Sequence, residues 1–194
     1  VALRRSIAEQ HTQALRAAGF EPLLLDIEPL AALNAVAAMG ADFNRTAGIP
    51  HNDRGSFCLL HFGAAHIDLS IVRDGTPLAC RMLEPGDADI IRDIAGSKRI
   101  EYPEAVALFT RGATATDELY PCFERFIGRL AGELRSSFDY FRREFDFTCE
   151  RVYLSGGLAD RPGVPELMHR ATQLPAVRFD PLVNVNLDAL DNRV

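Results

Sequence analysis

The sequence predicts an α/β fold in which strands and helices are arranged around one mixed sheet. Three apolar runs with strand-like alternation, at residues 57–62, 66–72 and 77–83, are separated by short turns. A long amphipathic helix is expected over about residues 117–145. A strand, a glycine turn, a helix and a second strand then follow between residues 151 and 179. Because a helix between two strands usually joins them in parallel, we expect a right-handed β–α–β unit there.

The N-terminal part predicts a helix, a strand and a second helix. Apolar residues recur at helical spacing over about residues 3–18, and Gly19 follows as a C-terminal cap. The apolar run at residues 23–27 indicates a short strand, and a proline then begins a helix over about residues 29–38. Residues 41–55 are polar and rich in turn formers, so we expect them to connect two parts of the fold.

The first three strands of the sheet are expected to form an antiparallel meander. Asp74-Gly75 lies between two alternating runs and is a strong hairpin signal, and Gly63 lies in the turn before the second run. Two short helices should follow, over residues 87–95 and 103–109.

The long helix is the clearest single element of the sequence. Its apolar residues recur every three or four positions, and Pro121 is tolerated because it lies in the first turn. The stripe consists of Leu119, Phe123, Phe126, Leu130, Leu134, Phe138, Phe141 and Phe145. The last strand, turn, helix and strand are expected at residues 151–155, 156–157, 162–174 and 176–179.

Composition limits the classes of function. The 194 residues are 47% hydrophobic, which excludes a disordered or fibrous chain. Twenty-one basic against 27 acidic residues give a net charge of −6, which opposes binding to nucleic acid or to an anionic membrane. No apolar run reaches the roughly 18 residues that a membrane span needs. The chain begins with Val1 and shows no signal-peptide pattern, so we expect a fragment of a longer protein.

The cysteines indicate a reducing compartment. None of the four lies in a CxxC pair, and each has apolar neighbours. We therefore expect all four to be reduced and buried, in a cytoplasmic protein. They are Cys58, Cys80, Cys122 and Cys149.

Few residues suggest chemistry by themselves. Gly156-Gly157 follows a strand, where it could admit a ligand to the backbone or form a tight turn only. Asp68 lies on the same strand face as His66, near His61, but no fourth metal ligand is visible, so we expect exposed hairpin histidines and no metal site. Ser155 lacks the G-x-S-x-G pattern of a hydrolase nucleophile, and no catalytic residue is predicted.

Four passages together resemble the PilM family of type IV pilus assembly proteins, within the actin-like ATPase superfamily. The most specific passages are the turn Leu154-Ser155-Gly156-Gly157-Leu158-Ala159 and the residue sequence of the long helix. The hairpin containing Gly63 is shared with the whole superfamily, including the division protein FtsA. The passages lie at residues 18–34, 60–86, 132–141 and 152–163.

The resemblance implies an actin-like (RNase H-like) ATPase fold, of which this chain holds one lobe with a small inserted α/β subdomain. Residues 1–55 would be the end of the first lobe and a connecting helix. Residues 56–194 would be the second lobe, with the insertion at about residues 86–115. Nucleotide-binding positions carried over from the family are Gly63 and Ala64 in the second phosphate hairpin, and Gly156 and Gly157 in the turn against adenosine.

Other family positions are changed in ways that weaken a nucleotide site. His61 stands where the family's hairpin begins with an aspartate near the metal-bound phosphates, and His66 and Ile67 replace hydroxyl residues. Val106 and Phe109 replace a glutamate and a lysine that face the nucleotide in the family. Phosphoryl transfer depends on positioning and charge, so we expect a degenerate site without hydrolysis, leaving ATP with Mg²⁺ open as a bound cofactor.

Three functions follow as hypotheses. The favoured one is a cytoplasmic scaffold at the bacterial inner membrane, similar to MshI and GspL, that couples pilus or secretion platform proteins to an assembly ATPase. Its partners would be short cytoplasmic tails of those membrane proteins, and self-association is a family property left open. The second is an ATP-dependent conformational switch of the same fold. The third, an RNase H-like enzyme, requires clustered acidic metal ligands that the sequence does not show.

Overall fold

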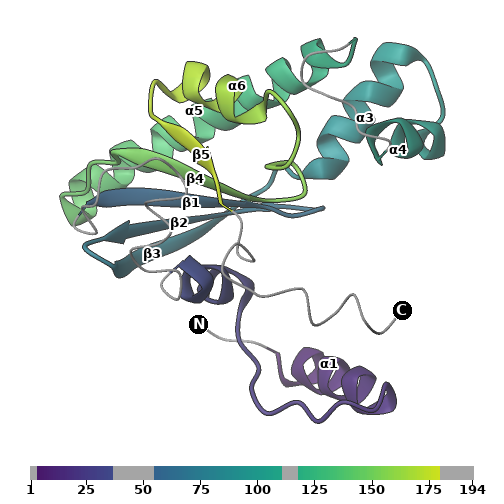
Figure 1. Ribbon diagram of the computed structural model, residues 1–194, viewed down its shortest axis with the longest axis vertical. Coiled ribbons are helices and arrows are strands. Elements are labelled where there is room, and N and C mark those ends of the chain that lie inside the picture. The colour runs from purple at the N-terminus through teal and green to yellow at the C-terminus, as the bar shows by residue number, and fades with distance from the viewer. Residues whose placement is uncertain (1–3, 37–54, 111–117, 180–194) are drawn as a thin grey trace, which may run out of the picture.

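A five-stranded mixed sheet is the centre of the computed structural model, which describes residues 4–36, 55–110 and 118–179 (Figure 1). The sheet has the order β3-β2-β1-β4-β5, with antiparallel pairs among β1, β2 and β3 and parallel pairs at β1–β4 and β4–β5. The predicted meander and the parallel β–α–β unit are therefore confirmed. The strands are β1 (Ser56–Phe62), β2 (Ile67–Arg73), β3 (Thr76–Leu83), β4 (Arg151–Gly156) and β5 (Ala176–Arg178).

The helices agree with the predicted ones to within a few residues. The longest, α5, has 26 residues and carries Pro121 in its first turn, as expected from the missing N–H of proline. α3 continues three residues past its predicted end and stops at Arg99, whose φ of 56° is left-handed. The helices are α1 (Arg5–Ala17), α3 (Asp87–Lys98), α4 (Tyr102–Thr110), α5 (Tyr120–Phe145) and α6 (Val164–Thr172), with a further helix at residues 28–36.

The two faces of the sheet are covered by different helices. In Figure 1, α5 and α6 cover one face and the helix at residues 28–36 lies on the other. Alternation along the strands explains this, because successive side chains point to opposite faces. Cys58, Leu60 and Phe62 belong to the larger core with the apolar stripe of α5. Leu59 belongs to a second core, which also holds Leu33 of the 28–36 helix.

The stripe on α5 is buried along most of its length. Phe123, Phe126, Leu130, Leu134 and Phe141 are at most 2% exposed, as the periodicity predicted. Phe138 and Phe145, near the C-terminal end, are only partly buried. Next to α5, the pair α3 and α4 lies at one end of the sheet (Figure 1). Arg125 of α5 contacts both carboxylate oxygens of Asp93 in α3.

Two predictions about burial and strands are wrong. Residues 23–27 are not a strand, since no described strand pairs with them, and Leu23 and Leu24 remain 92% and 85% exposed. An apolar run forms a strand only where a neighbouring strand accepts its hydrogen bonds. Cys80 is exposed rather than buried, because it lies on the edge strand β3, most of which remains open to solvent. Cys58, Cys122 and Cys149 are buried as expected.

Some of the predicted organisation falls outside the described residues. This applies to the connection at residues 41–55, apart from Gly55, and to the end of the 29–38 helix. Within the expected insertion, residues 86–110 contain α3 and α4 and no strand, and residues 111–115 are not described. In the described segments, no helix combines the length and apolar character needed to cross a membrane.

Candidate functional site

The predicted site residues meet at the carboxyl ends of two parallel strands. Phe62 of β1 is in register with Gly156 of β4, so the strands end side by side. Gly63 and Ala64 follow the first strand, and Gly157 follows the second. Ligands of α/β folds commonly bind at such an edge. The register therefore brings together all four residues that the sequence assigned to a nucleotide.

Helix α3 begins against the same hairpin. The N–H of Asp87 donates to the carbonyl of Gly63 (3.2 Å), and the N–H of Ala88 donates to the carbonyl of Ala64 (3.1 Å). A Cβ at Gly86 would lie 2.5 Å from the carbonyl carbon of Ala65, so this approach requires glycine. The first N–H groups of α3 are thus occupied by the hairpin and are not available to a phosphate.

The glycines of the site have different structural roles. A Cβ on Gly63 would lie 2.9 Å from the carbonyl oxygen of His66, which closes the hairpin. Gly156 has a φ of +87°, and a Cβ there would lie 2.2 Å from the carbonyl oxygen of Phe62. The fold itself therefore requires both glycines. Gly157 is exposed, and an added Cβ would lie 3.5 Å from Asp87 Oδ2, which is an ordinary contact, so this position is open.

His61 is held between two partners on the face of the sheet opposite α5. Its Nδ1 lies 2.9 Å from Ser155 Oγ in β4, and its Nε2 lies 3.1 Å from Glu28 Oε1 at the start of the 28–36 helix. Because a carboxylate only accepts hydrogen bonds, Nε2 carries the proton in this contact. Both ring nitrogens are therefore engaged within the protein.

Asp68 is the buried acid of this group. It is paired across the strands with His61 and is 6% exposed. Burial raises the pKa of its carboxyl, and Glu28 raises it further, while His66 and His61 act in the opposite direction. The side chains of His61 and His66 are 27% and 31% exposed, so the expectation of exposed hairpin histidines is wrong. His61 is half-buried beside Ser155 of β4 and Glu28, and His66 lies near Glu28 as well.

Glu28 is a site residue that no sequence pattern indicated. It lies 33 positions before His61, and no motif links the two. Only the packing of the 28–36 helix on the sheet through Leu33 brings this carboxylate to the hairpin.

A second charged group lies on the side of Gly157. Burial raises the pKa of Asp87 to about 6, and the Arg161 guanidinium lowers it in part. Arg161 lies over the ring of Phe109, 4.8 Å from its centroid. Phe109 is 7% exposed and stacks on Phe123, so it fills the core where the family resemblance implies a lysine. Val106, on the same helix, is partly buried against this core.

The hairpin side of the site offers few hydrogen-bond donors to a phosphate. The Gly63 N–H donates to the carbonyl of His66 (3.0 Å) and is unavailable to a phosphate. The carboxylates of Glu28 and Asp68 lie near the hairpin, and that of Asp87 lies near Gly157. Without a cation between them they would repel phosphate oxygens, and His61 stands where the family resemblance implies an aspartate. The side of Gly157 is open and has the cation of Arg161 nearby.

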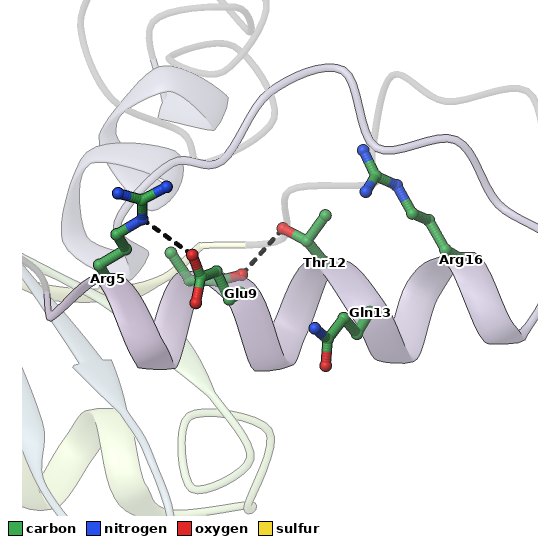
Figure 2. A pocket seen from close by; sticks show the side chains of 6 residues that line it. Arg5, Glu9, Thr12, Gln13 and Arg16 are labelled. Atoms are coloured by element: carbon green, nitrogen blue, oxygen red, sulfur yellow. Dashed lines mark hydrogen bonds and ion pairs between the residues drawn. The ribbon is translucent and has the colours of Figure 1, made fainter.

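A hollow of about 180 Å³ lies along α1, away from these residues (Figure 2). Arg5, Glu9, Thr12, Gln13 and Arg16 from this one helix line it. Figure 2 shows Arg5 contacting Glu9 and the Thr12 hydroxyl contacting the backbone one turn earlier, at distances of 2.8 Å each. Such contacts within a single solvated helix do not form a ligand site.

A sequence model described as "Type IV pilus assembly protein PilM" matches residues 1–193 of the chain. The chain belongs to the PilM family. This confirms the resemblance on which the site assignment depends. No curated protein shows significant sequence similarity to this PilM-family chain.

Solved structures support the same fold. The chain is similar to a structure described as the PilM-PilN type IV pilus biogenesis complex, with 28% identity, a TM-score of 0.74, and coverage of 92% of this chain and 49% of that one. The ethanolamine utilization protein EutJ from Carboxydothermus hydrogenoformans is 22% identical with a TM-score of 0.69, over 91% of this chain and 57% of that one. MreB5 of Spiroplasma citri bound to AMPPNP is 12% identical with a TM-score of 0.61, over 91% and 60%. The predicted actin-like fold is confirmed, and this PilM-family chain spans about half the length of the chain that it matches in the PilM-PilN complex.

Proposed function

We propose that this PilM-family chain is part of a scaffold with a degenerate nucleotide site, located in the cytoplasm at the bacterial inner membrane. The scaffold would couple platform proteins of a type IV pilus, or of a related secretion system, to the assembly ATPase. Family membership and the likeness to a PilM-PilN complex support a pilus assembly role. They also favour a partner of the PilN kind, which would present a short cytoplasmic tail.

The state of His61 is the observation that carries the proposal. His61 stands where the family resemblance implies an aspartate near the metal-bound phosphates. Its two ring nitrogens are 2.9 Å from Ser155 Oγ and 3.1 Å from Glu28 Oε1. An imidazole held in this way supplies no carboxylate oxygen to Mg²⁺. Phe109, buried in the core, likewise supplies no cation. Hydrolysis is therefore not supported by the side chains present.

The two-lobe division remains part of this proposal. Residues 1–55 would complete the first lobe and connect to residues 56–194, the second lobe with its insertion at about 86–115. The start of the sheet at Ser56 supports a division near residue 55.

A conformational switch that binds ATP is the second candidate, and Arg161 favours it. Its guanidinium lies over Phe109 and interacts with Asp87, next to the open position Gly157. Arg161 Nε is buried without a hydrogen-bond partner in the part of the chain that the structure describes. A cation that is not fully paired could bind a nucleotide phosphate in place of the family's lysine.

Isothermal titration of Mg-ATP into the full-length protein separates the two candidates. The scaffold predicts no binding at millimolar nucleotide. Saturable binding that is lost in Gly157→Arg, which fills the open position, and in Arg161→Ala would establish the switch instead. Gly128→Arg is the matched control, because Gly128 is an exposed helical glycine with open space around its Cβ.

Partner binding provides the positive test of the scaffold. A fluorescent peptide from the cytoplasmic tail of a PilN-type protein should bind the full-length protein with a Kd that Mg-ATP does not change. A change in Kd with Mg-ATP would favour the switch, and absence of binding to any platform tail would contradict the scaffold.

A further inference from the structure

Three potential metal ligands from two separate segments converge beside the hairpin. They are Glu28, at the start of the 28–36 helix, His66, which immediately precedes β2, and Asp68, the second residue of β2. His66 Nε2 lies 3.8 Å from Glu28 Oε2 and 3.8 Å from Asp68 Oδ2. The three ligand atoms all lie within 4.8 Å of one another. None of the predicted nucleotide residues takes part.

Asp68 provides an independent indication that a cation belongs here. Its side chain is 8% exposed, and Oδ2 is buried without a hydrogen-bond partner among the described residues. An unsatisfied buried carboxylate oxygen is strongly unfavourable, because desolvation is not offset by a donor. His66 approaches this oxygen only to 3.8 Å, beyond hydrogen-bond distance. The oxygen therefore lies in the cluster without a donor to offset its burial, as an oxygen that binds a cation would.

We propose that Glu28, His66 and Asp68 bind a divalent metal ion of the zinc type. One imidazole nitrogen and two carboxylate oxygens suit Zn²⁺, whereas Mg²⁺ and Ca²⁺ are usually surrounded by oxygen alone. Ligand atoms around a tetrahedral zinc lie about 3.3 Å apart, given bonds of about 2.0–2.1 Å. The cluster therefore needs to contract slightly. Glu28 can supply that movement, since its side chain is 54% exposed.

His61 positions one of these ligands. Its Nε2–H donates to Glu28 Oε1 at 3.1 Å, which leaves Oε2 directed toward His66. Hydrogen bonds of this kind orient metal-binding carboxylates in many sites. Water would take the fourth position around the ion. The ion would then fasten the start of the 28–36 helix to β2, and this role needs no nucleotide.

Zinc binding to the full-length protein tests the site. The protein is stripped with EDTA, exchanged into buffer and equilibrated by dialysis against Zn²⁺, and bound metal is measured by mass spectrometry. We expect a single equivalent of zinc, with a Kd raised about tenfold or more in His66→Ala and in Asp68→Asn. His11→Ala is the control and should bind as the parent does, because His11 is exposed on α1.

Thermal unfolding distinguishes a loss of zinc binding from a variant that fails to fold. Zinc should raise the Tm of the parent and of His11→Ala, and should leave that of His66→Ala unchanged. Circular dichroism in EDTA verifies that the variants are folded. Zinc binding that is equal in the parent and in both site variants, or the absence of stoichiometric binding, would overturn the proposal. Neither result bears on the ATP titration, so the metal site and the scaffold can fail separately.

Discussion

Replacing Gly156 with alanine should destabilise the protein far more than the same change at Gly157. The left-handed backbone at Gly156, with φ at +87°, costs an alanine about 1–2 kcal/mol. The added Cβ would also lie 2.2 Å from the carbonyl oxygen of Phe62 and 2.9 Å from its backbone nitrogen and carbonyl carbon. Because these are backbone atoms, relief requires the ends of β1 and β4 to separate.

The size of the effect follows from these two contributions. Forced overlap in a packed region costs about 1–3 kcal/mol, so the total loss at Gly156 is about 2–5 kcal/mol in the free energy of unfolding. This is a large share of the about 5–15 kcal/mol that stabilises a typical domain. At Gly157, an added Cβ meets only Asp87 Oδ2 at 3.5 Å, an ordinary contact. Gly157→Ala should therefore change stability by less than about 0.5 kcal/mol.

Urea unfolding followed by circular dichroism, without nucleotide, measures both variants. In a separate thermal melt, the expected loss at Gly156→Ala corresponds to a fall in Tm of roughly 4–20 °C for a protein of this size. A loss below about 1 kcal/mol at Gly156, by the standard of ordinary surface substitutions, would refute the close approach of β1 and β4. An equal loss at Gly157 would show that this position is packed and not open to a ligand.

Three further perturbations test other parts of the structure. Asp87→Asn should stabilise the protein by about 1–2 kcal/mol at pH 8, after allowing for solvent screening of a partly exposed group. The pKa of Asp87 is raised to about 6 in the folded protein, so this gain in stability should decline as the pH falls through 6. Urea unfolding at pH 5 and at pH 8 measures the gain. Destabilisation of Asp87→Asn at pH 8 would contradict a buried charge at this position. Phe123→Ala should lose about 3–5 kcal/mol, because this ring is fully buried, while Phe20→Ala at a 66% exposed position should be nearly neutral in the same assay. Thiol labelling of the native protein should modify Cys80 rapidly; equally rapid labelling of the three buried cysteines would show that the core is open.

Hydrophobic periodicity predicted most of the fold correctly. The stripe that includes Phe126 identified α5 because a long helix shows its buried face directly in the sequence. Residues 23–27 are not the predicted strand, because an apolar run shows a tendency toward burial but not the neighbouring element that would bury it. Cys80 was misplaced for a related reason: the sequence did not show that β3 is an edge strand.

The site could be predicted only in part. The pairing of β1 with β4 brings Gly63 next to Gly157, which follows from two strand-to-turn motifs and parallel topology. Glu28 could not be found, because its approach to His61 depends on how a separate helix packs on the sheet. The contact between Arg161 and Phe109 was also not predicted, because Arg161 follows β4 and lies far from Phe109 in the sequence.

The pairing of the central strand also has a consequence for synthesis on the ribosome. β1 pairs with β2 almost as soon as both are made, but its other neighbour is β4, and the paired residues His61 and Ser155 are 94 positions apart. At a synthesis rate of about 5–20 residues per second, the edge of β1 that pairs with β4 stays unpaired for on the order of 5–20 s. During that interval the hairpin presents an unpaired strand edge, which other chains can join. Nascent copies of this protein therefore face their greatest risk of aggregation before residue 156 emerges.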